Sequence, residues 1–198
     1  MKKAKYRQIL RAAEALVGRG RFHEITMDEV ARKAGVGKGT IYRYFKDKDA
    51  LFFELAMSGY DELADMIRAQ RRRSSDFRAC LVNVCRCISD FYRGRRHLMH
   101  MMHSEERRAT WRRGQFRELF MERRKMLEEA VCTVLDEGRG AGLLRHDIPL
   151  PVLASFMLSV LRMRARSRHS GDKADIGYDT VVELFLHGAG SVEGGTSA

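Results

Sequence analysis

A short basic and aromatic segment near residue 40 carries the side chains best suited to contacts with a nucleic acid. It reads Lys38-Gly39-Thr40-Ile41-Tyr42-Arg43-Tyr44-Phe45, and Lys48 follows three positions later. Lysine can donate to guanine O6 and N7, and threonine can contact a thymine methyl group or a phosphate. Glycine lets the backbone approach a ligand closely. The segment therefore predicts base contacts by Lys38, Gly39 and Thr40, whereas Arg43 is equally suited to a base contact and to solvent.

The residues just before this segment predict how it is presented. A capping box is formed by Thr26-Met27-Asp28-Glu29, and it opens a short helix that ends at Lys33. The next four residues include Gly35, which is free to adopt a left-handed conformation. A second helix begins at Lys38 and completes a helix-turn-helix, whose second helix enters the major groove. Thr26 and Met27 would offer a hydroxyl and backbone N–H groups to a phosphate.

Positive charge is concentrated in the N-terminal quarter of the chain. The 198 residues have a formal charge of +11, and residues 1–48 hold 13 Lys or Arg against 5 Asp or Glu. This asymmetry is typical of a module that binds a polyanion. Charges interrupt every apolar stretch well before the ~18 residues that a membrane span needs, and residues 1–10 lack the apolar core of a signal peptide. We therefore expect a cytoplasmic protein with no membrane partner.

The remainder of the sequence predicts an all-α fold. Only two prolines occur, no stretch shows the polar–apolar alternation of a half-buried strand, and good helix formers dominate. Helices are expected at about 3–17, 27–33, 38–45, 48–70, 76–93, 95–103, 105–138, 149–166 and 178–189.

Residues 9–55 resemble the DNA-binding module of the TetR/AcrR family of bacterial regulators. The resemblance is carried by an ordered run of matches: Ile9-Leu10, Ala12-Ala13, Phe22, Thr26-Met27-Asp28-Glu29-Val30-Ala31, Ala34-Gly35-Val36, Gly39-Thr40-Ile41-Tyr42, Tyr44-Phe45, Lys48 and Leu51. The run covers about a quarter of the chain. The rest is similar to the family only in length and helical layout.

The resemblance implies a TetR-like all-α architecture with four parts. These are a helix-turn-helix DNA-binding domain (1–48), a connecting helix (49–72), a ligand-binding and dimerisation domain (73–190) and a disordered tail (191–198). It also implies phosphate contacts by Tyr42, Tyr44 and Lys48, although either tyrosine could instead pack in the core. It implies a nucleoid-associated protein that binds double-stranded operator DNA.

The resemblance further implies a homodimer formed by the last two helices. The sequence is compatible, because both helices carry apolar stripes at helical spacing. The expected interface residues are Leu153, Phe156, Met157, Val160, Leu161, Val181, Val182, Phe185 and Ala189. The alternative is that the stripes pack within one chain.

A pocket for a small apolar or amphipathic effector is expected among the middle helices, where methionine and aromatic side chains are frequent. An ordinary hydrophobic core explains the same residues equally well. The candidates are Met99, Met102, Trp111, Phe116, Phe120, Met126 and Phe156.

Histidine and cysteine residues could form a metal or redox site, but their positions in the sequence do not favour one. His97, His100 and His103 lack a carboxylate-rich surrounding, and Cys80, Cys85 and Cys87 flank an apolar helical stripe. We expect these cysteines, with Cys132, to be free thiols, and we expect no metal and no cofactor.

Taken together, the sequence predicts a ligand-responsive transcriptional regulator, most simply a repressor that binds a palindromic operator as a dimer. The alternative is a DNA-binding regulator without a small effector, switched by a protein partner or by cysteine oxidation. An enzyme is not expected, because the sequence has no Gly-rich phosphate loop, nucleophile elbow or metalloprotease helix.

Overall fold

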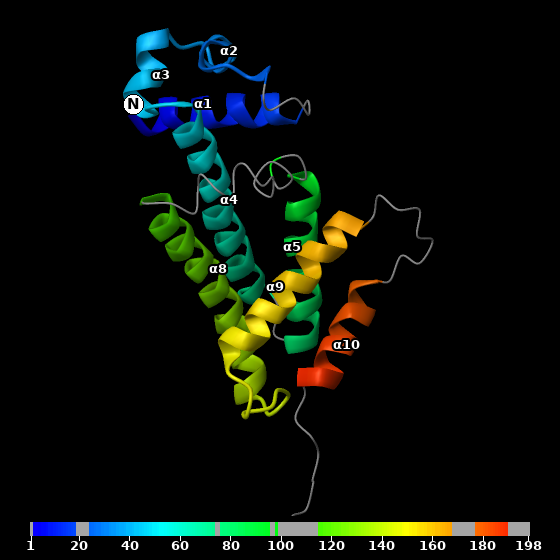
Figure 1. The fold of residues 1–198 in the computed structure, drawn as a ribbon. Helices are drawn as coiled ribbons and strands as arrows, with labels where there is room; N and C mark the ends of the chain where they lie inside the picture. Colours follow the sequence, from blue (N-terminus) through cyan, green and yellow to red (C-terminus); the bar gives the residue numbers. More distant parts are fainter. Residues whose placement is uncertain are drawn as a thin grey trace, which may run out of the picture. The chain divides into compact units, whose positions relative to one another are not determined.

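The computed structural model describes residues 2–18, 24–73, 76–95, 98, 115–167 and 177–189. Within these residues the chain forms eight α-helices and no strand: α1 (Lys2–Val17), α2 (Met27–Lys33), α3 (Lys38–Tyr44), α4 (Lys48–Arg71), α5 (Phe77–Gly94), α8 (Gln115–Gly140), α9 (Leu150–Ser167) and α10 (Tyr178–Ala189) (Figure 1). The all-α prediction is confirmed. The chain divides into two compact units, Met1–Tyr60 with Arg95–Arg123, and Asp61–Gly94 with Arg124–Ala198.

The first unit holds α1, α2, α3 and the beginning of α4. Its core is apolar and includes Ile9, Ala13, Leu16, Val30, Ala31, Ile41, Phe45 and Phe52. Tyr6 ties α1 to the others, because its hydroxyl donates to Glu54 Oε2 at 2.8 Å and its ring stacks on Phe45 at 5.4 Å. The first turns of α8 also belong here, where Phe116 packs on Phe53 and Phe120 on Tyr60. These contacts join α1 and the start of α8 to α4 and pack Tyr6 against Phe45 at the end of α3.

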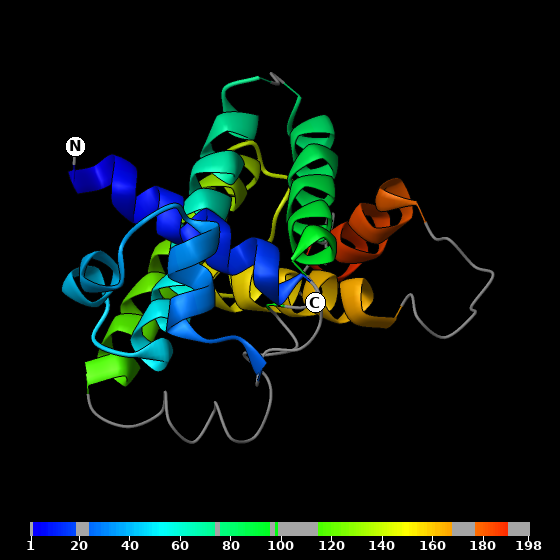
Figure 2. The same cartoon turned by 90° about the horizontal axis from the view of Figure 1, so that it is seen from above.

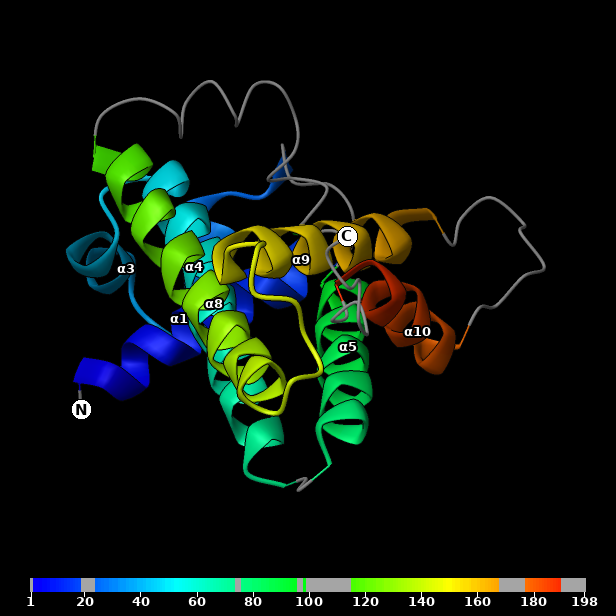
Figure 3. The ribbon, with the colours of Figure 1, turned by 90° about the horizontal axis from the view of Figure 1, so that it is seen from below.

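In the second unit, α9 and α10 both pack against α5, as the views from above and below show (Figures 2 and 3). Helices α5 and α9 are in contact, and the apolar side chains that both contribute to the core are buried: Leu81, Val84 and Ile88 of α5, and Leu153, Met157 and Leu161 of α9. Arg78 of α5 pairs with Glu183 of α10 at the surface. No helix in the described ranges is long and apolar enough to cross a membrane.

The cysteines of α5 are free thiols within the core, as predicted from their position beside the apolar stripe. Burial raises the pKa of Cys80 and Cys87, and it raises the pKa of Cys85 to about 12. The thiolate is the reactive form of cysteine. Burial therefore disfavours oxidation of these three side chains at neutral pH.

We expect the stability of the protein to fall as the pH rises above 9. An unfolded Cys85 thiol ionises near pH 9.0, whereas the folded thiol stays protonated until about pH 12. The folded state thus binds more protons in that window, and stability that is complete below pH 9 is lost on the way to pH 12. At pH 10 the loss from this one group is about 1.4 kcal/mol. Urea unfolding of the wild type and of Cys85→Ala at pH 8, 9 and 10 measures it. The two proteins should show different pH slopes, and parallel slopes would contradict the assignment.

Candidate nucleic-acid interface

The turn between α2 and α3 is a Schellman motif, which sets the angle of the helix-turn-helix. The N–H of Val36 donates to Ala31 O at 3.0 Å and that of Gly35 to Arg32 O at 3.1 Å. Gly35 has φ = +60°, a conformation that favours glycine. Gln8 of α1 adds a bond to Ala34 O at 2.7 Å. The predicted left-handed turn is confirmed.

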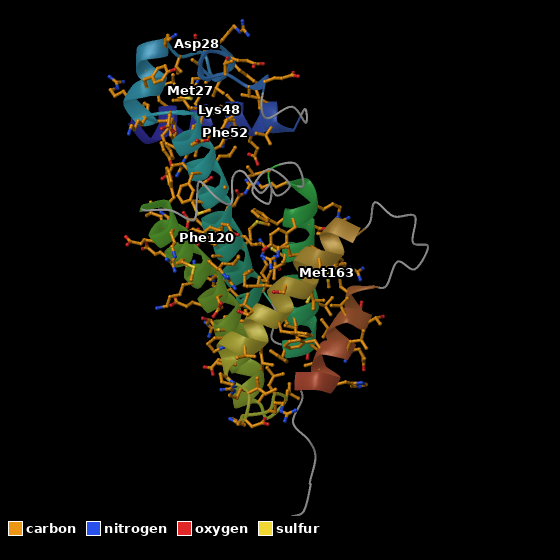
Figure 4. All side chains as sticks on the ribbon, in the orientation of Figure 1. Met27, Asp28, Lys48, Phe52, Phe120 and Met163 are labelled. Atoms are coloured by element: carbon orange, nitrogen blue, oxygen red, sulfur yellow. The ribbon has the colours of Figure 1, made fainter. Side chains whose placement is uncertain are left out.

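The N-terminus of α2 is capped by Thr26, whose hydrogen bond is one of the two in the predicted capping box. Thr26 Oγ1 accepts a hydrogen bond from the N–H of Glu29 at 3.1 Å. The Thr26 hydroxyl still has its own proton to donate. The side chain of Met27 is buried, so this residue can offer only its backbone N–H to a phosphate. Figure 4 labels Met27 and Asp28 at this end of α2.

Helix α3 divides cleanly into an inward and an outward face. Ile41 and the following Phe45 are buried in the core of the unit. The outward side chains are Lys38, Tyr42 and Arg43, with Thr40 half-buried beside them. A Cβ added at Gly39 would meet no atom within 4 Å. Packing within the chain therefore does not require glycine at this position, which leaves room for a close approach from outside.

The two tyrosines of α3 differ in environment. Tyr42 is 45% exposed, and its hydroxyl can reach an external partner. Tyr44 is half-buried, with its ring 6.3 Å from that of Tyr6 and 6.4 Å from that of Phe45. The guanidinium of Arg43 lies over the Tyr44 ring at 5.8 Å. The packing alternative for Tyr44 therefore has direct structural support.

Lys48 begins α4, next to the end of α3 (Figure 4). Asp47 caps this helix, since its Oδ1 accepts the N–H of Ala50 at 2.8 Å. Lys48 is half-buried and lies in the same unit as Thr26, Lys38 and Tyr42. The unit therefore combines hydroxyl, ammonium and backbone donors, which are the groups that bind DNA phosphates.

The predicted stripe of α9 is split between two environments. Leu153, Met157 and Leu161 are buried, whereas Phe156 is 58% exposed. One turn after Val160, Met163 extends the outward edge and is 64% exposed (Figure 4). Met163 was not among the predicted interface residues, although its spacing of seven from Phe156 places it on the same helical face.

Helix α10 shows the same division. Val182 and Phe185 are buried, Val181 is half-buried, and Leu184, which was not predicted, is 66% exposed. The Phe156 ring stacks on that of Phe185 at 6.4 Å. The Ala189 side chain lies outside the described residues.

Together, α9, α10 and Cys85 of α5 line an apolar groove of about 390 Å³. We call its outward residues, Phe156, Val160, Met163 and Leu184, the apolar face. Among the described residues that line the groove, Arg164 is the one charged side chain. Protein surfaces that face water rarely carry so many large apolar side chains together.

The predicted effector residues are distributed over both units. Phe116 and Phe120 pack on α4 in the first unit, and Met126 and Phe156 belong to the second. Met99, Met102 and Trp111 lie outside the described residues, as do His97, His100 and His103. Among the residues that the structure covers, no group of three or more His, Cys, Asp or Glu could hold a metal ion.

These features define a helical protein of the helix-turn-helix class. Residues 9–55 match the family model described as bacterial regulatory proteins, tetR family. The "Fatty acid metabolism regulator protein" of Bacillus subtilis is 39% identical over 27% of this chain and 28% of its own length. The "HTH-type transcriptional repressor AcnR" of Corynebacterium diphtheriae is 24% identical over 78% of this chain and 75% of its own.

A solved structure shares the fold of nearly the whole chain. It is the regulator FadR from Bacillus subtilis in complex with stearoyl-CoA, with a TM-score of 0.71 and 19% identity, covering 92% of this chain and 96% of that one. The chain is therefore similar to tetR-family regulators in residues 9–55 and in its helical fold. Its match spans less than two thirds of the length of several of its curated relatives.

Proposed function

We propose that this protein is a ligand-responsive transcriptional repressor that binds a palindromic operator as a homodimer. The observation that carries the proposal is the outward face of α3, a helix held rigidly by Ile41 and Phe45. Lys38, Gly39 and Thr40 would contact base edges in the major groove, with Arg43 beside them. Thr26, the Met27 N–H, Tyr42 and Lys48 would contact phosphates, and Tyr44, whose ring packs within the unit, would do so only through its hydroxyl.

A second copy of the chain is the proposed occupant of the apolar face. One helix-turn-helix reads only a few base pairs, too few to stand out among competing genomic sites. Two copies related by a two-fold axis would read two half-sites and so multiply the specificity. The groove between α9 and α10 offers an apolar surface for such an association. In this proposal residues 1–48 bind DNA, residues 49–72 form the connecting helix, and residues 73–190 bind the ligand and form the dimer. The predicted tail lies outside the described residues.

An amphipathic acyl compound is the proposed effector class. A neighbour in fold binds stearoyl-CoA, and a relative similar in the N-terminal module is a fatty acid metabolism regulator. We propose repression and not activation because one relative, AcnR, is a transcriptional repressor. The alternative, a switch by cysteine oxidation, is disfavoured by the raised pKa of the buried Cys85 thiol.

Selection of bound DNA from a random pool tests the proposal. We expect an inverted repeat whose half-sites are centred about 34–36 Å apart or further. Stearoyl-CoA added to the recovered complex should release the DNA at micromolar concentration, whereas coenzyme A alone should not. Recovery of no consensus would overturn DNA recognition. A consensus that stearoyl-CoA and other acyl-CoA esters leave bound would overturn only the effector class.

A further inference from the structure

The ammonium group of Lys38 is bound by a carboxylate of the neighbouring helix. Lys38 Nζ on α3 donates to Asp28 Oδ2 on α2 at 2.9 Å, and the two side chains are 67% and 60% exposed. The hydrogen bond and the charge of Asp28 raise the pKa of Lys38. Asp28 therefore contacts the first side chain of α3, the helix proposed to enter the major groove.

Each member of this pair would have a different effect on DNA if it stood alone. An unpaired ammonium binds any phosphate, and this attraction is independent of sequence. An unpaired carboxylate beside the start of α2 repels phosphates. When the two charges lie 2.9 Å apart, their fields largely cancel at longer range. The pair thus adds little to the non-specific attraction between the protein and DNA.

The hydrogen bond to Asp28 leaves Lys38 able to read a base. An ammonium group has three N–H donors, and Asp28 Oδ2 accepts one of them. Two donors remain for acceptors such as guanine O6 and N7. A lysine side chain also has considerable rotamer freedom, and part of it is already lost in the free protein when Asp28 holds the ammonium.

We propose that Asp28 is a positioning residue for sequence discrimination, which aims the Lys38 ammonium at base edges and withdraws its charge from non-specific phosphate binding. The inference rests on the proposed function, because it assumes that α3 enters the groove. It assigns a specificity role to an acidic residue on the helix that does not itself read the bases.

The variant Asp28→Asn tests the inference, with dissociation constants measured on the operator and on a scrambled duplex of equal length. We expect the ratio of the two constants to fall about fivefold, the upper range for an exposed ion pair. Most of the change should come from tighter binding to the scrambled duplex. The salt dependence on that duplex should steepen by up to about 0.9 per subunit, because Lys38 is released to bind phosphates.

Two controls separate positioning from a general change in charge. Glu29→Gln removes a carboxylate from the same turn of α2, and it should change the ratio much less than Asp28→Asn. In a Lys38→Met background, Asp28→Asn should no longer change the ratio. Circular dichroism verifies that each variant is folded.

The outcomes distinguish this inference from the function on which it rests. If the wild type does not discriminate the operator from the scrambled duplex, both fail. If the wild type discriminates but Asp28→Asn does so equally, only the role of Asp28 is overturned. The same holds if Glu29→Gln has an equal effect, or if the effect of Asp28→Asn persists without Lys38.

Discussion

A protein that carries Phe156→Glu together with Leu184→Glu is expected to be a folded monomer that binds its operator no more tightly than unrelated DNA. Both side chains belong to the apolar face and are more than half exposed. A carboxylate at either position costs the monomer little, whereas burying it in an apolar interface without a partner is strongly unfavourable. Since specific binding exceeds non-specific binding by about 10³-fold or more, operator affinity should fall by at least that factor.

Sedimentation equilibrium and operator titration measure the two effects. Phe185 is unsuitable for this test because it is buried, so a charge there would disturb the core of the same chain. The control is Leu143→Glu, which adds one carboxylate at an exposed apolar residue outside the apolar face. The control should remain dimeric with full affinity. If the double variant still sediments as a dimer, the dimer interface must lie on another surface of the protein.

Replacing Lys48 by alanine should weaken operator binding by about 60-fold at 0.1 M salt. Each lysine that neutralises a phosphate contributes about 0.9 to the slope of log K against log salt concentration. A dimer has two copies of Lys48, so the slope should become shallower by about 1.8. Over the one decade between 1 M and 0.1 M salt, this change in slope gives the expected loss of about 60-fold. Fluorescence anisotropy with a labelled operator between 50 and 300 mM salt gives both numbers.

Two further variants make this measurement specific. Tyr42→Phe removes a neutral hydroxyl donor, so it should lower the affinity and leave the salt slope unchanged. Lys125→Ala removes an exposed charge on α8, in the second unit of the chain, and it should alter neither quantity strongly. An unchanged slope for Lys48→Ala would rule out a phosphate contact by that side chain.

Local signals in the sequence determined the helix-turn-helix. The ends of α2 follow from Thr26 and Gly35, because an N-cap hydroxyl and a left-handed glycine act on their own few residues. The inward placement of Ile41 and Phe45 follows from their spacing of four on a helix. These interactions join residues close together in the chain, and they can be read without knowing the rest of the fold.

Contacts between distant residues were decided only by the tertiary structure. The stripe of α9 was predicted as one surface, but packing on α5 buries Leu153 and Met157 and leaves Phe156 and Met163 outside. Helical periodicity identifies apolar positions and cannot tell which neighbour covers each of them. Tyr44 likewise packs on Tyr6, nearly forty residues earlier in the chain.

The pairing of Lys38 with Asp28 is another contact that only the tertiary structure decided. Both residues were noted in the sequence, one for its chemistry and one as part of a capping box. Their 2.9 Å contact exists because the Schellman turn at Gly35 sets the angle between α2 and α3. Sequence determined which groups are available to bind DNA, while the tertiary structure decided which of them restrain one another, since an ion pair depends on the distance between side chains and not on their separation in the chain.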